Sequence, residues 1–253
     1  MSQIILPELD PNEKPGERPY EMVWAKRTEP APPHVRFDDL RGWTMQVSGG
    51  AQATLQVSRA QNVWERPVAR LRYRGDGKAT SQPRIVITFP QPIALPDGAD
   101  SVDVWLYGNR WDWVNPPGTP PVSIILHLRD GDGSAHNLTV DRVRWEEWWL
   151  MHRRLPAMRF PVRLESLEVA GGWQAEWREI FFDSIRFYRE ELPPLQFAPR
   201  PQRNLTLFEG QSPGANTGAT KLPFPTREET ILPMHFGGAF RTTVSGSQQK
   251  GYL

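Results

Sequence analysis

A short aromatic and polar segment near the middle of the chain has side chains suited to contacting sugar rings. Asn109, Arg110, Trp111, Asp112 and Trp113 follow a strand-like run and precede a Pro-Pro pair, so we expect them to form a loop. Indole rings can stack on the apolar faces of pyranose rings, while amide and guanidinium groups hydrogen-bond to hydroxyls. The segment therefore predicts a carbohydrate-binding platform. The alternative is that the loop folds back and buries both tryptophans.

A second pair of tryptophans, Trp148 and Trp149, lies on a predicted strand. Because neighbouring residues of a strand point to opposite faces of the sheet, one of the two rings has to face away from the core side. That ring could extend the binding platform or lie beneath a neighbouring module.

Residues of the types used in catalysis are present, but their spacing does not group them. Glu146 and Glu147 are adjacent on a predicted strand, so they cannot flank one glycosidic bond, which needs carboxylates about 5 to 9 Å apart. His127 and His152 each stand alone on a predicted strand, which favours a structural role over that of a base. The sequence therefore favours a chain that is not an enzyme by itself.

Composition excludes several classes of function. The formal net charge of +1 gives no electrostatic basis for binding nucleic acid or an anionic membrane. The chain has no cysteine, which excludes disulfides, thiolate zinc sites and a cysteine nucleophile. No apolar run is long enough to span a bilayer, and the N-terminus does not read as a signal peptide. We expect either a cytoplasmic protein or a secretion signal outside this sequence.

Period-2 alternation bounded by Gly, Asp and Pro predicts an all-β fold of about ten strands and no helix. The fold class that follows is an antiparallel β-sandwich of jelly-roll type with extended, Pro-rich arms at both ends. Its predicted core consists of the same-face residues of three runs: Val102, Val104, Leu106, Val122, Ile124, Leu126, Ile185 and Phe187.

The distribution of proline and tryptophan predicts the domain boundaries. The two flanks hold 15 of the 26 prolines, while ten of the eleven tryptophans fall between 36 and 190. Since proline removes donors from a strand ladder, we expect an extended arm over 1–34, the sandwich over 35–192 and a Pro-rich tail over 193–253. The tail is apolar enough to lead into a further module, which predicts an excerpt from a longer protein or a tail that packs on its own sandwich.

Two short motifs, at the first and last predicted strands, resemble the edge motifs of galactose-binding-like jelly-roll carbohydrate-binding modules. They are Phe37-Asp38-Asp39-Leu40 with Gly42-Trp43, and Phe182-Asp183-Ser184-Ile185-Arg186-Phe187-Tyr188. The resemblance implies that the two strands lie close together and that an acidic residue from each holds a structural calcium. Asp38 and Asp183 would be those ligands, with Asp39 as a substitute, although the family often has Asp-Asp or Asp-Asn where this chain has Asp-Ser.

Three longer segments resemble the N-terminal modules of large multidomain proteins of environmental bacteria that act on or bind polysaccharide. They are 107–113, 145–155 and 222–233. Together the resemblances imply a non-catalytic carbohydrate-binding or accessory module of a larger polysaccharide-active protein, with a polysaccharide or oligosaccharide and neighbouring domains as its partners. The alternatives are a jelly-roll polysaccharide lyase or glycoside hydrolase, and a structural interdomain module without a ligand.

Overall fold

The computed structural model describes residues 3–112 and 120–191, together with three short C-terminal strands. The chain divides into two compact units, Met1–Leu192 and Pro193–Leu253. The described part of the second unit is a three-stranded antiparallel sheet of β13 (Thr230–Pro233), β14 (Phe240–Val244) and β15 (Gln249–Gly251).

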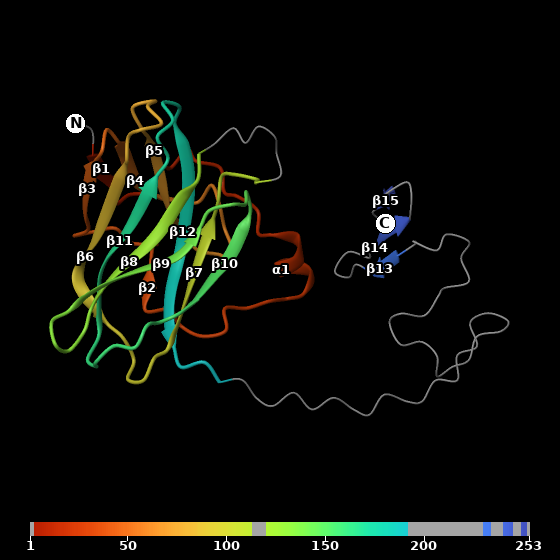
Figure 1. Cartoon of the computed structure of the whole chain (residues 1–253). Helices are drawn as coiled ribbons and strands as arrows, with labels where there is room; N and C mark the ends of the chain where they lie inside the picture. Colours follow the sequence, from red (N-terminus) through yellow and green to blue (C-terminus); the bar gives the residue numbers. More distant parts are fainter. Residues whose placement is uncertain (1–2, 113–119, 192–229, 234–239, 245–248, 252–253) are drawn as a thin grey trace. The chain divides into compact units, whose positions relative to one another are not determined.

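The first unit is built from two β-sheets, a seven-stranded and a five-stranded one (Figure 1). The seven-stranded sheet has the order β1-β4-β5-β12-β7-β10, with β2 also paired to β12. Its strands are β1 (Gln3–Leu6), β2 (Val35–Arg36), β4 (Gln52–Ser58), β5 (Val68–Arg74), β7 (Ser101–Tyr107), β10 (Trp148–Arg154) and β12 (Arg178–Tyr188).

The five-stranded sheet has the order β3-β6-β11-β8-β9. Its strands are β3 (Thr44–Ser48), β6 (Arg84–Ala94), β8 (Val122–Arg129), β9 (Ala135–Arg142) and β11 (Arg163–Gly171). Among these pairings only β1 with β4 is parallel. The predicted antiparallel β-sandwich is confirmed.

The core lies between the two sheets and consists of alternate residues from facing strands. On β7, Val102, Val104 and Leu106 are fully buried, and β8 and β12 contribute in the same way. All eight predicted core residues are at most 1% exposed. Period-2 alternation identified them because a strand presents every second side chain to one face.

The opposite face of the seven-stranded sheet, which we call the outer face, is partly covered by the N-terminal residues. These residues are more ordered than the sequence predicts, since they contain β1 and the five-residue helix α1 (Tyr20–Trp24) (Figure 1). Met22 of α1 is buried in a second, smaller hydrophobic cluster with Val63, Val68, Trp148 and Phe181. The Pro-rich composition of this segment gave no indication that it forms a layer over the sheet, with apolar side chains such as Met22 packed against it.

The beginning and the end of the sandwich meet, as the resemblance implied. Strand β2 pairs with β12, and the N–H of Phe37 donates to the carbonyl oxygen of Asp183 over 3.2 Å. The register of β12 on β7 shifts between Phe182 and Ser184, which places Asp183 at a β-bulge. In the described part of the chain, no helix has both the length and the apolar character needed to cross a membrane.

Candidate functional site

A cavity of about 440 Å³ opens on the outer face of the seven-stranded sheet. Its floor consists of side chains from three adjacent strands, β12, β7 and β10, and its walls come from the N-terminal segment 26–33 and from Trp64. We call this cavity the outer-face pocket.

Strand register explains why the floor residues converge, together with His152, which adjoins the floor without lining the pocket. Arg186, Asp103 and His152 are directly opposite one another on β12, β7 and β10 and form one row across the sheet. Ser184, Trp105 and Leu150 form the next row. Because both rows alternate with the core positions of the same strands, every one of these side chains leaves the sheet on its outer face.

Asp103 is the centre of the polar row. Its side chain is almost completely buried, and its Oδ2 accepts a hydrogen bond from Arg186 Nη2 over 2.8 Å. Its Oδ1 lies 3.0 Å from both His152 Nδ1 and the hydroxyl of Tyr188. A buried carboxyl group is costly unless it is hydrogen-bonded, and here both oxygens of Asp103 have partners that fix the orientation of the side chain.

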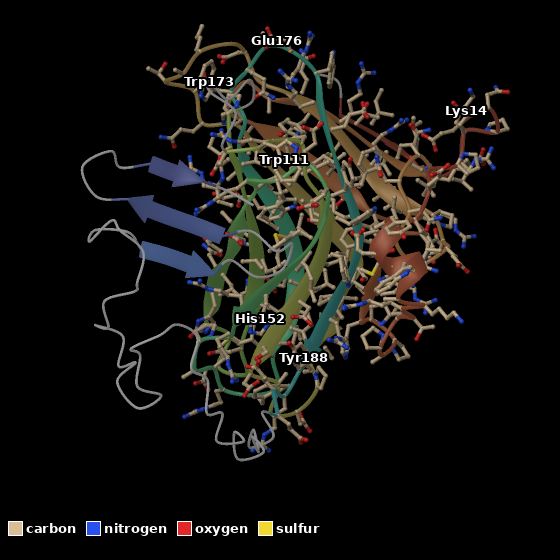
Figure 2. The ribbon with its side chains drawn as sticks, turned by 90° about the vertical axis from the view of Figure 1, so that its right-hand side faces the viewer. Lys14, Trp111, His152, Trp173, Glu176 and Tyr188 are labelled. Atoms are coloured by element: carbon tan, nitrogen blue, oxygen red, sulfur yellow. The ribbon has the colours of Figure 1, made fainter. Side chains whose placement is uncertain are left out.

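Tyr188 and His152 lie side by side at one end of the sheet, as Figure 2 shows, with the Tyr188 oxygen 3.2 Å from His152 Nδ1. Burial and the negative charge of Asp103 raise the pKa of Tyr188 to about 12. The hydroxyl is therefore protonated at neutral pH and acts as a hydrogen-bond donor. The guanidinium carbon of Arg186 lies 4.8 Å from the centre of the Tyr188 ring, an arrangement that also orients Arg186.

The aromatic part of the outer-face pocket consists of two indoles, Trp105 on the floor and Trp64 in the wall. Trp64 and Trp105 are perpendicular, with their ring centroids 5.6 Å apart. The guanidinium carbon of Arg18 lies 5.9 Å from the Trp64 ring centroid, and Arg18 Nε donates to the carbonyl of Val63 over 3.0 Å. Both rings are thus held in place by the covering layer and the sheet, which gives the pocket a rigid apolar side.

Segment 26–33 is fixed to the sheet by an ion cluster. Glu29 receives two hydrogen bonds from Arg66, of 2.7 and 2.8 Å, and Arg66 Nη2 also donates to Asp183 Oδ2 over 2.6 Å. Asp183 is fully buried, and this burial raises the pKa of its carboxyl group to about 6 against the opposing effect of Arg66.

The same cluster bears on the predicted calcium site at Asp38 and Asp183. Arg66 occupies one carboxylate oxygen of Asp183 and supplies the positive charge that an ion would bring, so a divalent cation beside it would be repelled. Asp38 is half-buried, and the described residues contain no group of three His, Asp or Glu side chains placed to hold a metal. The residues present do not fit a calcium site centred on Asp183. The prediction of calcium binding from the resemblance is tested only by adding and removing the ion.

In the predicted binding loop, the described side chains of residues 109–112 mostly contact other parts of the protein and do not form an open platform. The amide of Asn109 donates to the hydroxyl of Tyr73 over 3.1 Å, and Arg110 Nε donates to Asp112 over 2.7 Å. Trp111 is half-buried and packs against the main core, while Asp112 is exposed. Trp113 lies outside the described residues. Figure 2 shows Trp111 toward the opposite end of the sandwich from His152 and Tyr188, so this loop and the polar row of the pocket are separate surfaces.

The Trp148–Trp149 pair divides between two environments, as strand geometry requires. Trp148 is opposite Tyr107 on the outer face and is buried in the smaller cluster, where its ring meets Tyr107 edge to face at 5.8 Å. Trp149 is on the other face of the edge strand β10, is 50% exposed, and lies 6.0 Å from the ring of Trp145. Neither ring lines the outer-face pocket.

The sequence did not single out the pocket residues, although it contained a usable signal. Asp103, Trp105 and Arg186 occupy the alternate positions of the two runs that supplied the predicted core. Charged and aromatic residues at every second position of a central strand indicate that the second face of the sheet is also packed against something, and is not fully exposed to solvent. Trp64 gave no such signal, because it lies in an irregular segment.

The histidines and glutamates weighed as catalytic residues are placed as follows. His127 bridges Asn137 and Glu168 on the five-stranded sheet, with nitrogen–oxygen distances of 2.7 and 2.8 Å, which is the structural role predicted for it. His152 is hydrogen-bonded in the polar row. Glu146 and Glu147 precede β10 and are exposed.

Comparison with known proteins gives likenesses of fold at low identity. No protein-family model matches the chain, and no curated protein matches it. One similar solved structure comes from work on the promiscuous specificity of carbohydrate-binding modules of the β-sandwich superfamily. It has a TM-score of 0.42 and 10% identity, and the likeness covers 60% of this chain and 59% of that one. TmCBM61 in complex with β-1,4-galactotriose is similar with a TM-score of 0.39 and 16% identity, over 63% of this chain and 100% of that one.

A third solved structure, the family 11 carbohydrate-binding module from Clostridium thermocellum in complex with a β-1,3-1,4-mixed-linked tetrasaccharide, has a TM-score of 0.37 and 10% identity. The likeness covers 61% of this chain and 93% of that one. Because the TM-scores are below 0.5 and the identities are 16% or less, a functional assignment has to be argued from the residues of this chain.

Proposed function

We propose that this chain is a carbohydrate-binding module, non-catalytic and accessory to a larger polysaccharide-active protein, and that the outer-face pocket is its binding site. The carrying observation is the convergence of an aromatic pair and a fixed polar row on one cavity. Its volume of about 440 Å³ falls within the roughly 300 to 1,000 Å³ typical of small-ligand sites. The combination matches a sugar, which has apolar ring faces and a rim of hydroxyls.

Each wall of the pocket has a part in this proposal. Trp105, between β12 and β10 on the sheet floor, offers a ring to the apolar face of a pyranose, and Trp64 fixes the orientation of that ring. Asp103 holds Arg186 over 2.8 Å, and the remaining N–H groups of Arg186 can donate to the hydroxyl oxygens of a sugar. Because these groups are ordered before a ligand arrives, little conformational entropy is lost on binding.

The test is a glycan array on the wild type, followed by calorimetry with the best ligand on Trp105→Ala. Loss of the stacking ring should weaken binding roughly tenfold, since an aromatic contact contributes about 0.5 to 1.5 kcal/mol beyond its area. Trp105→Phe should retain part of the affinity. Trp149→Ala is the matched control, because it removes an exposed indole that does not line the pocket.

Unaltered binding by Trp105→Ala, with its melting temperature preserved, would place the site elsewhere on the sandwich. In that case the surface around Asn109, Arg110 and Asp112 becomes the next candidate. If the wild type binds nothing on the array, the chain is a structural interdomain module.

A lyase or glycosidase is the second candidate, and one observation favours it. Tyr188 and His152 do not line the pocket, but they contact the lining residue Asp103, so a hydroxyl and an imidazole lie close to the cation Arg186, a set of groups that an elimination or hydrolysis could use. Against it, Tyr188 keeps its proton at neutral pH and donates it to Asp103, so the phenol is not available as a base. Incubation with a polysaccharide panel and detection of any released sugar decides between the two.

A further inference from the structure

We infer that the outer-face pocket takes a saccharide that carries a carboxylate, such as a uronic acid residue, in preference to a neutral one. This inference rests on the proposed function, and it follows from the state of the charged groups that line the pocket. Two carboxylates and three cations line it: Glu29 and Asp103, and Lys26, Arg27 and Arg186.

The carboxylates that line the pocket already have partners. Both oxygens of Glu29 accept hydrogen bonds from Arg66. Asp103 receives Arg186 on one oxygen and is within hydrogen-bond distance of Tyr188 and His152 on the other. Neutral sugars offer hydroxyl donors that need acceptors, and most of the acceptor capacity of these two residues is therefore used within the protein.

The cations are in the opposite state. In the part of the chain that the structure describes, neither Lys26 nor Arg27 forms a salt bridge, and both side chains are exposed at the pocket wall. Arg186 uses Nη2 for Asp103, which leaves further N–H groups of its guanidinium. The donors left for a ligand are thus mostly charged, and charged donors make their strongest hydrogen bonds with carboxylates.

The backbone at Lys26 supports a role for its side chain. Lys26 follows α1 with a φ of 49°, in the left-handed region, where helices most often end with glycine. A lysine there carries a conformational cost without forming an ion pair within the described protein. A ligand with an acidic group would give that side chain a partner.

The arrangement also indicates how the sugar would lie. Trp105 and Arg186 belong to neighbouring strands of the floor, while Lys26 and Arg27 belong to the wall segment above it. A pyranose stacked on Trp105 would place its carboxylate between the floor guanidinium and the wall cations. One acidic group would then be shared by the sheet and segment 26–33.

The experiment compares charged saccharides with uncharged forms of the same backbone. Oligosaccharides of galacturonate, glucuronate and mannuronate are each titrated as the free acid and as the methyl ester, with the wild-type chain at low and moderate salt. We expect at least one free acid to bind, its ester to bind at least about tenfold more weakly, and the affinity for the acid to fall as salt rises. A sulfated dextran and its neutral parent form a further arm, which separates a requirement for carboxylate from general attraction to anions.

Three variants test the residues. Lys26→Gly removes the charge and relieves the left-handed backbone, so the melting temperature should hold or rise while binding of the free acid weakens roughly three- to tenfold. Arg27→Gln should weaken binding by a similar factor. Lys78→Gln is the control, because it removes an exposed cation from the turn after β5, away from the pocket lining, and should change nothing.

The outcomes separate this inference from the proposed function. Equal or tighter binding of the esters, or of neutral glycans, would overturn the preference for a carboxylate and leave a carbohydrate-binding module. Sulfated dextran bound as well as any uronate would also overturn it, in favour of general anion attraction. If no saccharide of any kind binds, both proposals fail.

Discussion

Arg66 and Asp183, 117 positions apart in the sequence, form an ion pair of 2.6 Å in which the aspartate side chain is completely buried. Arg66 also holds Glu29, so one guanidinium connects the wall of the outer-face pocket to the bulge in β12. The pocket and the junction between the first and last strands are therefore mechanically linked. A change at Arg66 acts on both.

Replacing Arg66 by methionine should destabilise the fold. The substitution leaves the buried Asp183 carboxylate without a cation, and breaking a buried pair in this way costs about 3 kcal/mol or more. Denaturant unfolding at pH 8, where Asp183 is ionised, measures the loss. Arg72→Met is the matched control, since Arg72 is half exposed in a salt bridge of 3.7 Å with Glu179 and should cost less than about 1 kcal/mol. If both variants lose the same free energy of unfolding, the buried ion pair contributes no more to stability than the exposed one.

The raised pKa of Asp183 predicts a pH dependence with a definite sign. Burial lifts the pKa from its usual value near 4 to about 6, so the folded chain binds this proton more tightly than the unfolded chain does. The contribution of Asp183 to stability is therefore most favourable below pH 4 and falls as pH rises to 6, by roughly 3 kcal/mol.

Asparagine at position 183 removes this titration, so the comparison isolates it from other groups. The free energy of unfolding of the wild type minus that of Asp183→Asn should decrease between pH 4 and 6 and stay constant above pH 7. Other carboxyls oppose this trend, since Arg84 and His127 hold the pKa of Glu168 below its usual value, but they cancel in the difference. A difference that rises with pH over the same window would contradict the assignment.

The fold was predictable from the sequence because the strands of the sandwich have one buried face. Val102, Val104 and Leu106 alternate with polar or aromatic residues, and Ile185 and Phe187 do the same on β12. Period-2 burial leaves a direct record in the sequence, and turn residues such as Gly98 mark where strands begin. Helix α1 left no such record, since five residues are too few to establish a 3.6-residue period.

The pocket was not predictable in the same way, because its parts come together only through strand order. Asp103 and Arg186 are neighbours because β12 lies beside β7, which no local pattern in either strand specifies. Trp64 joins them from a segment without periodicity. The sequence alone does not show that Trp111, in the loop after β7, packs against the core, since its burial depends on how that loop folds back.

The ion cluster also bears on the predicted calcium at Asp38 and Asp183, and a chelator tests it. Because Arg66 already compensates Asp183, we expect the melting temperature to be the same in calcium and in EDTA. A structural site of moderate affinity, saturated a hundredfold above its Kd, would instead add about 2.7 kcal/mol. A rise of several degrees on adding calcium, abolished by Asp38→Asn, would establish the site despite the arginine.

Trp111→Ala distinguishes the loop after β7 from the outer-face pocket as the place where a saccharide binds. Trp111 packs against the main core, so its removal should cost about 2 kcal/mol, less than the roughly 3 to 5 kcal/mol of a fully buried tryptophan. Calorimetric affinity for the best saccharide should be unchanged below the melting temperature, because Trp111 does not line the pocket. Trp149→Ala serves as the control for stability, since its ring is half exposed at the edge strand and should cost less. If Trp111→Ala instead melts like the wild type and loses its ligand, the loop of Asn109, Arg110 and Asp112 is the binding platform and the pocket is not.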